Sequence, residues 1–188
     1  MSDTSWHEEV GRRAVTVQII VGALFAGSFG FLVVAAVLVQ MGTVEPNEEM
    51  AWAMNLVLIA FLVAEMIALA MVPRLIVAQG RRKIAAGQWP VPQGPGQEQF
   101  AEFVERCGDA GRLLAVYQTK KIIACALLEG VAFFAIIVYL ITQSPVGLAV
   151  AIVMIVGLAF HFPTRSGVVH WIEDQLAKIE QERRSQSI

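Results

Sequence analysis

The sequence carries little charge for its length. Only 16% of its 188 residues are Asp, Glu, Lys or Arg, whereas 56% are hydrophobic. Soluble domains usually contain about 25% charged residues. The deficit falls in four long stretches that are almost free of charge, and the remaining charges crowd between them. This pattern is typical of a membrane protein and argues against a soluble globular domain.

Other absences exclude further classes of protein. The net charge is -2, so no excess of positive charge indicates a nucleic-acid partner. The two cysteines, Cys107 and Cys125, form no CxxC pair, and their expected surroundings do not favour a disulfide. No GxSxG, Walker or GxGxxG motif is present. We therefore expect a protein that is not an enzyme and that holds no cofactor.

The four apolar stretches are predicted to cross the membrane. Each reaches or approaches the ~20 residues that a hydrocarbon core of ~30 Å requires. Lipid offers the backbone no hydrogen-bond partners, and the stretches lack the alternation of a barrel, so each is predicted to be a helix. The fold class is therefore all-α, a four-transmembrane-helix bundle with cytoplasmic helical extensions. The predicted spans are 14–39, 50–72, 122–141 and 146–162, within a membrane domain of residues 14–163.

The basic residues predict the orientation. All 14 lysines and arginines fall in the N-terminal tail (1–13), the loop 73–121 and the C-terminal segment 164–188. The loops 40–49 and 142–145 contain none. Lysine and arginine collect on the cytoplasmic side of membrane proteins, so we expect both termini in the cytoplasm and the protein in the cell (inner or plasma) membrane. The first stretch exceeds the roughly 7–15 apolar residues of a signal peptide, so we expect it to remain in place.

The large cytoplasmic loop is predicted to contain two helical parts and a link. Segment 88–96 holds three prolines and two glycines, which exclude a helix. Before it, the second span is expected to continue through Arg81. After it, helical spacing from Gln97 onward predicts a helix that runs nearly unbroken into the third span, although Gly108 and Gly111 weaken it.

The C-terminal segment is predicted to be an amphipathic helix. Its apolar residues recur at helical spacing and form one stripe. The stripe can pack on the loop helix, lie on the inner membrane surface or pair with a second copy, and the sequence does not decide among these. Its members are Val168, Ile172, Leu176 and Ile179.

Two carboxylates, Glu65 and Glu129, lie inside the predicted spans, and His161 lies near the inner end of the fourth. At 1.5 Å per residue, both acids sit roughly 12–14 Å from the nearest cytoplasmic basic residues. A charge at such a depth costs about 2.5–3.5 kcal/mol or more, so we expect these groups to face the bundle interior. They are candidate ion- or proton-binding residues. A protonated glutamic acid can equally serve only to hold two helices together.

No metal site is predicted from these three residues. They would come from three different helices and show no local ligand spacing. The stretch 128–138, which contains Glu129, resembles the acid-bearing helix of rotary ATPase proteolipid subunits. The resemblance covers less than a tenth of the chain, and the glycine-rich partner helix and short polar loop of that family are absent, so it implies no function for the whole chain.

Small residues in the first span, Gly22, Ala26 and Gly30, recur every four positions and predict a face for close helix packing.

The leading hypothesis is a non-enzymatic scaffold or subunit of a membrane assembly. Its expected partners are the lipid bilayer and a second copy or another membrane protein. The alternative is a small proton- or cation-coupled transporter or channel component that uses the intramembrane carboxylates.

Overall fold

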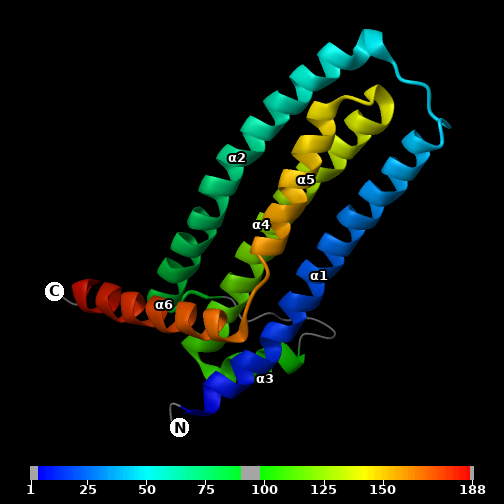
Figure 1. The fold of residues 1–188 in the computed structure, drawn as a ribbon. Helices are drawn as coiled ribbons and strands as arrows, with labels where there is room; N and C mark the ends of the chain where they lie inside the picture. The colour runs from blue at the N-terminus through cyan, green and yellow to red at the C-terminus, as the bar shows by residue number, and fades with distance from the viewer. Residues whose placement is uncertain (1–3, 90–97, 187–188) are drawn as a thin grey trace. The chain divides into compact units, whose positions relative to one another are not determined.

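The computed structural model describes residues 4–89 and 98–186, and every regular element within them is an α-helix (Figure 1). This confirms the predicted all-α class. The helices are α1 (Thr4–Gln40), α2 (Glu48–Ala85), α3 (Glu98–Cys107), α4 (Asp109–Thr142), α5 (Pro145–Phe160) and α6 (Arg165–Gln186).

Three of these helices, α1, α2 and α4, are long and apolar enough to cross a membrane. Helix α5 has 16 residues, and it counts toward a fourth span only when it is joined with α6 across their bent connection. The described chain therefore holds three to four candidate membrane-spanning helices. Helices of this kind indicate association with a membrane.

Local signals in the sequence set both ends of α2. At its start, the backbone N–H of Met50 donates to Asn47 Oδ1 over 3.1 Å, as in a helix N-cap. At its end, Gly87 adopts a φ of 68°, and the N–H of Gln88 donates to the carbonyl of Lys83 over 2.9 Å. The predicted continuation of this helix through Arg81 is confirmed.

The predicted loop helix is divided into two parts by a single residue. Gly108 separates α3 from α4 and has a φ of 56°, a left-handed conformation that favours glycine. The turn is tight, because a Cβ on Gly111 would lie 3.1 Å from Val104 Cα. Most of the predicted link at 88–96 lies outside the described residues.

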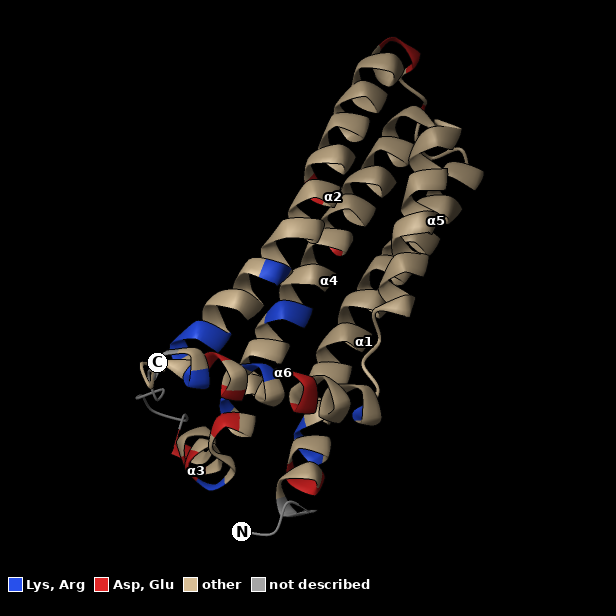
Figure 2. Ribbon diagram, turned by 90° about the vertical axis from the view of Figure 1, so that its left-hand side faces the viewer, with Lys and Arg blue, Asp and Glu red and all other residues tan. Residues whose placement is uncertain are grey.

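The chain divides into two compact units. We call Met1–Gln18, Pro73–Lys121 and Pro163–Ile188 the polar unit, and Ile19–Val72 and Ile122–Phe162 the apolar unit. Every lysine and arginine of the chain belongs to the polar unit. Figure 2 shows the basic residues confined to the segments that form this unit, while the apolar unit is almost entirely free of charge. Helices α1, α2 and α4 contribute residues to both units.

In the apolar unit, α4 lies between α1 and α2 (Figure 1). Phe133 of α4 packs on Phe31 of α1 at 5.3 Å between ring centroids, and Phe134 packs on Phe61 of α2 at 5.5 Å. Helix α5 approaches α4 through Gly147, where an added Cβ would lie 2.8 Å from the backbone N of Tyr139. Helix α4 is therefore the central helix of this unit.

The polar unit has its own apolar core. The predicted C-terminal stripe lies in it: Val168, Ile172 and Ile179 are buried and Leu176 packs against them. The first of the three predicted alternatives, packing on the chain's own loop residues, is therefore confirmed. The buried core residues are Val10, Ala14, Ile84, Phe103, Val104, Ala110, Leu113, Leu114, Val116, Tyr117, Val168, Ile172 and Ile179.

A guanidinium group ties three helices of the polar unit together. Arg183 of α6 donates to the carbonyls of Ile84 and Ala85 over 3.2 and 3.4 Å, at the C-terminal end of α2. It also forms an ion pair with Asp109 of α4 at 2.8 Å, and Asp109 in turn pairs with Arg112 at 2.9 Å. A cation at a helix C-terminus is favourable because the terminal carbonyls lack helical partners.

Candidate functional site

The three predicted ion-binding residues all lie in the apolar unit. Glu65 and Glu129 are half-buried, and Glu65 Oε2 is buried without a hydrogen-bond partner among the described residues. His161 follows α5, with Nδ1 3.0 Å from the carbonyl oxygen of Gly157. Within residues 4–89 and 98–186, no group of three or more His, Cys, Asp and Glu side chains is arranged to hold a metal ion.

The predicted small-residue face of α1 is only partly covered by the chain itself. A Cβ on Gly22 would make an ordinary contact of 3.8 Å with the Phe162 ring. Ala26 and Gly30 are exposed, and a Cβ on Gly30 would meet nothing within 4 Å. The close helix approach of this unit occurs instead at Gly147, which the sequence analysis did not single out.

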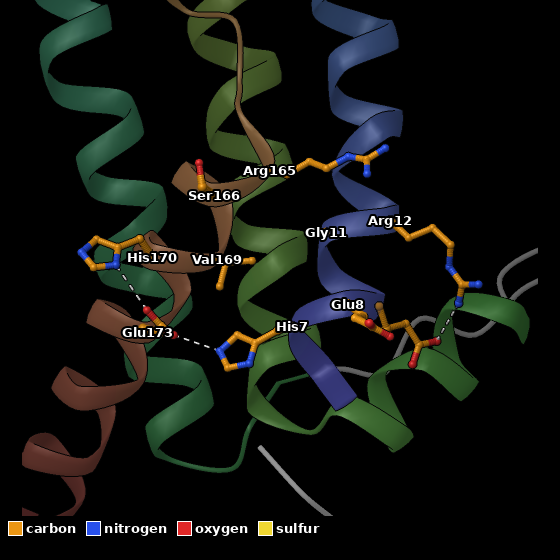
Figure 3. A pocket seen from close by; sticks show the side chains of 10 residues that line it. His7, Glu8, Gly11, Arg12, Arg165, Ser166, Val169, His170 and Glu173 are labelled. Carbon is orange, nitrogen blue, oxygen red and sulfur yellow. Dashed lines mark hydrogen bonds and ion pairs between the residues drawn. The ribbon is translucent and has the colours of Figure 1, made fainter. Parts of the chain in front are cut away.

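A groove in the polar unit brings together residues that the sequence separates widely. It has a volume of about 780 Å³ and lies between the first turns of α1 and the first half of α6 (Figure 3). Its lining includes charges of both signs and two of the three histidines of the chain. The lining residues are His7, Glu8, Glu9, Gly11, Arg12, Arg165, Ser166, Val169, His170 and Glu173.

One carboxylate, Glu173, joins the two histidines of this groove. Its Oε1 lies 2.9 Å from His7 Nε2 of α1, and its Oε2 lies 3.3 Å from His170 Nδ1 of α6. His170 and Glu173 meet because residues three apart share a face of a helix. Figure 3 shows both imidazole rings directed at the carboxylate. The ring of Trp6 also packs on that of His7, with 3.9 Å between the ring centroids.

A second carboxylate of the groove, Glu9, forms ion pairs with two arginines. It lies 3.0 Å from the guanidinium of Arg106 on α3 and 3.9 Å from that of Arg12. The Cys107 thiol donates to Glu9 Oε2 over 3.8 Å. Burial raises the pKa of the Cys107 thiol, and the adjacent Glu9 carboxylate raises it further. At a given pH, a smaller fraction of this thiol is therefore thiolate than of a free cysteine.

Two charged residues of the groove have no partner in the described part of the chain. Glu8 and Arg165 are exposed, and neither forms a hydrogen bond or an ion pair with another described residue. Ser166 also lines the groove, but no hydrogen bond joins it to His170 within the described residues. The groove thus offers an unpaired anion and an unpaired cation together with a histidine–carboxylate cluster.

Sequence reasoning did not find this groove. His7 and His170 stand 163 positions apart, one near each end of the sequence. The one local signal is the three-residue spacing of His170 and Glu173. The contact with His7 depends on how α1 and α6 pack, and no local pattern predicts that packing.

Comparison of the chain with known protein families, with curated proteins and with solved structures finds no match. The fold and the sites define the chain at one level only, as an all-helical protein with three to four helices apolar enough to cross a membrane. Its function has to be argued from its own geometry.

Proposed function

We propose that the protein spans the inner or plasma membrane four times, with the polar unit and both termini in the cytoplasm. The proposal is supported by the distribution of charge, since all 14 basic residues belong to the polar unit and none to the apolar unit. Helix α5 is then the fourth span. Its 16 residues cover about 24 Å at 1.5 Å per residue, and the apolar Phe162 lies just beyond its last residue.

Within this topology, the protein acts as a non-enzymatic subunit or scaffold that binds a protein partner through the groove between α1 and α6. The observation that carries this proposal is the pair of unpartnered charges, Glu8 and Arg165, in an open groove on a body with its own core. A polypeptide segment with charges of both signs would satisfy them. The backbone on both sides of the groove is helical, which lowers the entropy cost of ordering it on binding.

The same groove is poorly suited to hydrolysis. Ser166, His170 and Glu173 stand in an order that a serine hydrolase could use, and the last two are bonded. A nucleophilic serine, however, needs its hydroxyl within hydrogen-bond reach of the histidine base. No such bond is formed in the described residues, and the site is open to water.

The test is the mass of the protein extracted from native membranes in a mild detergent. We expect a complex well above the chain's own 20.5 kDa, and we expect Glu173→Gln to release a large part of the protein as monomer. The matched control is Asp174→Asn, which removes the same charge at the next, exposed position of α6, outside the groove. Recovery of monomer alone from wild-type membranes would overturn the proposal.

A second candidate function is supported by Glu65. Its Oε2 is buried in an apolar unit without a partner, and an unsatisfied buried acceptor is costly unless a proton or cation occupies it. A proton or cation pathway through Glu65, Glu129 and His161 would explain it. Proton and cation flux into liposomes would then be lost in Glu65→Gln and Glu129→Gln but retained in Glu48→Gln, whose residue lies in the first turn of α2. Absence of wild-type flux would remove this candidate.

A further inference from the structure

A second, smaller pocket of the polar unit lies where α2, α4 and α6 meet, and it has a volume of about 260 Å³. Two segments that form it adjoin the apolar unit, since Pro73 begins one and Lys121 ends the other. Four of its lining residues are basic and none is acidic. The lining residues are Pro73, Arg74, Val77, Ala78, Arg81, Lys120, Trp171, Gln175 and Lys178.

Most of this positive charge is not neutralised within the described chain. Arg81 forms an ion pair with Glu182 at 2.6 Å. Arg74, Lys120 and Lys178 form no ion pair with a carboxylate among the described residues. Three cations from three helices thus converge on one pocket and repel one another. An anion bound among them would remove this repulsion.

Lys120 is partly buried, whereas Arg74 and Lys178 are exposed. The ammonium group of Lys120 lies 4.9 Å from the ring centroid of Trp171 and 5.6 Å from that of Tyr117. The two rings fix the cation in place through cation–π contacts. Burial lowers the pKa of Lys120, and the neighbouring Lys121 lowers it further. The charged form is therefore under-stabilised when the pocket holds only protein side chains.

Gln175 gives a second, independent reason to expect a polar ligand in this pocket. Its side chain is only 5% exposed, and its Oε1 has no hydrogen-bond partner among the described residues. A buried amide group is normally satisfied, because leaving one unpaired costs about 1–3 kcal/mol. When the amide turns over, its NH₂ group can donate to an oxyanion in the pocket.

We propose that this pocket binds the phosphate of an anionic phospholipid headgroup. Arg74, Lys120 and Lys178 supply the charge, Gln175 supplies a neutral donor, and Trp171 supplies an amphipathic ring of the kind common at membrane interfaces. Basic pockets beside the cytoplasmic ends of spanning helices are suited to acidic lipid headgroups. The lipid source follows from the membrane topology proposed above, in which Pro73 and Lys121 stand at the ends of two spans. It does not depend on the partner groove.

The experiment measures binding by the purified full chain in a neutral detergent. Phosphatidylglycerol is titrated while thermal unfolding is followed by tryptophan fluorescence, and phosphatidylcholine and inorganic phosphate are titrated in parallel. We expect phosphatidylglycerol alone to raise the midpoint of unfolding. Each cation contributes about fivefold to the affinity for an anionic lipid, so Arg74→Gln with Lys178→Gln should weaken binding by about 25-fold.

The matched control is Arg82→Gln, which removes a charge from an exposed position of α2 outside the pocket and should leave the affinity unchanged. Equal shifts with phosphatidylcholine, or wild-type affinity in the double variant, would overturn the proposal. An equal shift with inorganic phosphate would overturn the lipid assignment. Native mass spectrometry of the wild-type chain needs no variant: a retained phosphatidylglycerol supports the proposal, and loss of both lipids alike contradicts it. Neither result bears on the mass of the native complex, so the partner groove can fail or stand separately.

Discussion

The polar unit and the apolar unit bury similar aliphatic and aromatic side chains, but they expose opposite kinds. Exposed positions of the polar unit are mostly charged or polar, whereas those of the apolar unit are mostly apolar. Phe160 is 86% exposed and Trp52 is 72% exposed. Many valines and isoleucines of α1 and α2 are also exposed. Large exposed apolar surfaces are rare on soluble proteins.

This difference is expected if water surrounds the polar unit and lipid surrounds the apolar unit, as proposed above. In the polar unit, water drives apolar side chains inward, so burial stabilises the fold. In the apolar unit, lipid is as apolar as leucine, so helix association depends on close packing and on polar contacts. Helix α4 runs without a break from the polar unit into the apolar unit. Its first part is therefore stabilised mainly by burial of apolar side chains, and its second part by close packing with its neighbours.

The largest expected effect tests this contrast at two phenylalanines. Phe103 is fully buried in the polar unit and Phe160 is almost fully exposed in the apolar unit. We expect Phe103→Ala to lower the free energy of unfolding by about 3–5 kcal/mol, because it removes buried area and leaves a cavity. Phe160→Ala should change it by less than about 0.5 kcal/mol. Denaturant unfolding in detergent micelles measures both, and equal losses would break the comparison.

Close packing in the apolar unit is tested at Gly147. A Cβ there would lie 2.8 Å from Tyr139 N and 3.0 Å from Ala135 O, so α4 and α5 must separate to admit it. We expect Gly147→Ala to lower the free energy of unfolding by about 1–3 kcal/mol. On α4, Gly130 has nothing within 4 Å of an added Cβ. Gly130→Ala should therefore be neutral or stabilise by up to about 1 kcal/mol through helix propensity. Changes in the unfolding midpoint of the same sign and size for both variants would contradict this account.

In the polar unit, Arg183 tests the contribution of polar contacts in water. It bonds the last carbonyls of α2 and pairs with Asp109. Its side chain is 45% exposed, so solvent screening limits its effect, and we expect Arg183→Gln to cost about 1 kcal/mol. The loss should shrink in high salt. Thermal unfolding at two salt concentrations measures this loss, with Arg82→Gln as an exposed control on α2. A loss of stability that is the same at both salt concentrations would argue against the ion pair.

The smallest effect concerns reactivity and not stability. Burial and Glu9 raise the pKa of Cys107, so at a given pH a smaller fraction of this thiol is thiolate. The measurement is the alkylation rate of Cys107 as a function of pH in a Cys125→Ala chain. We expect this rate to rise at a higher pH than the alkylation rate of a free thiol. Glu9→Gln removes the carboxylate and should move the profile toward lower pH. A profile unchanged by Glu9→Gln would show that burial alone protects the thiol.

Much of the fold could be predicted because it depends on local signals. The apolar stretches, the extension of α2 through Arg81 and the stripe from Val168 to Ile179 all follow from composition and period. The sequence predicts that Gly108 weakens the helix but not that the helix ends there, because a glycine can remain helical or adopt a positive φ. The groove around Glu173 could not be predicted, since it depends on contacts between segments about 165 residues apart. The intramembrane roles proposed for Glu65 and Glu129 stay predictions.

The central claim is that the chain crosses the membrane four times and keeps the polar unit in the cytoplasm. The direct test is labelling with a membrane-impermeant maleimide, in intact and in permeabilised cells, of single cysteines in a chain that carries Cys107→Ser and Cys125→Ala. Thr43→Cys probes the exposed loop between α1 and α2, and Gln181→Cys probes an exposed position of α6. We predict labelling of Thr43→Cys in intact cells and of Gln181→Cys only after permeabilisation. Labelling of Gln181→Cys in intact cells would contradict the claim, because it would mean that α5 does not return the chain to the cytoplasm.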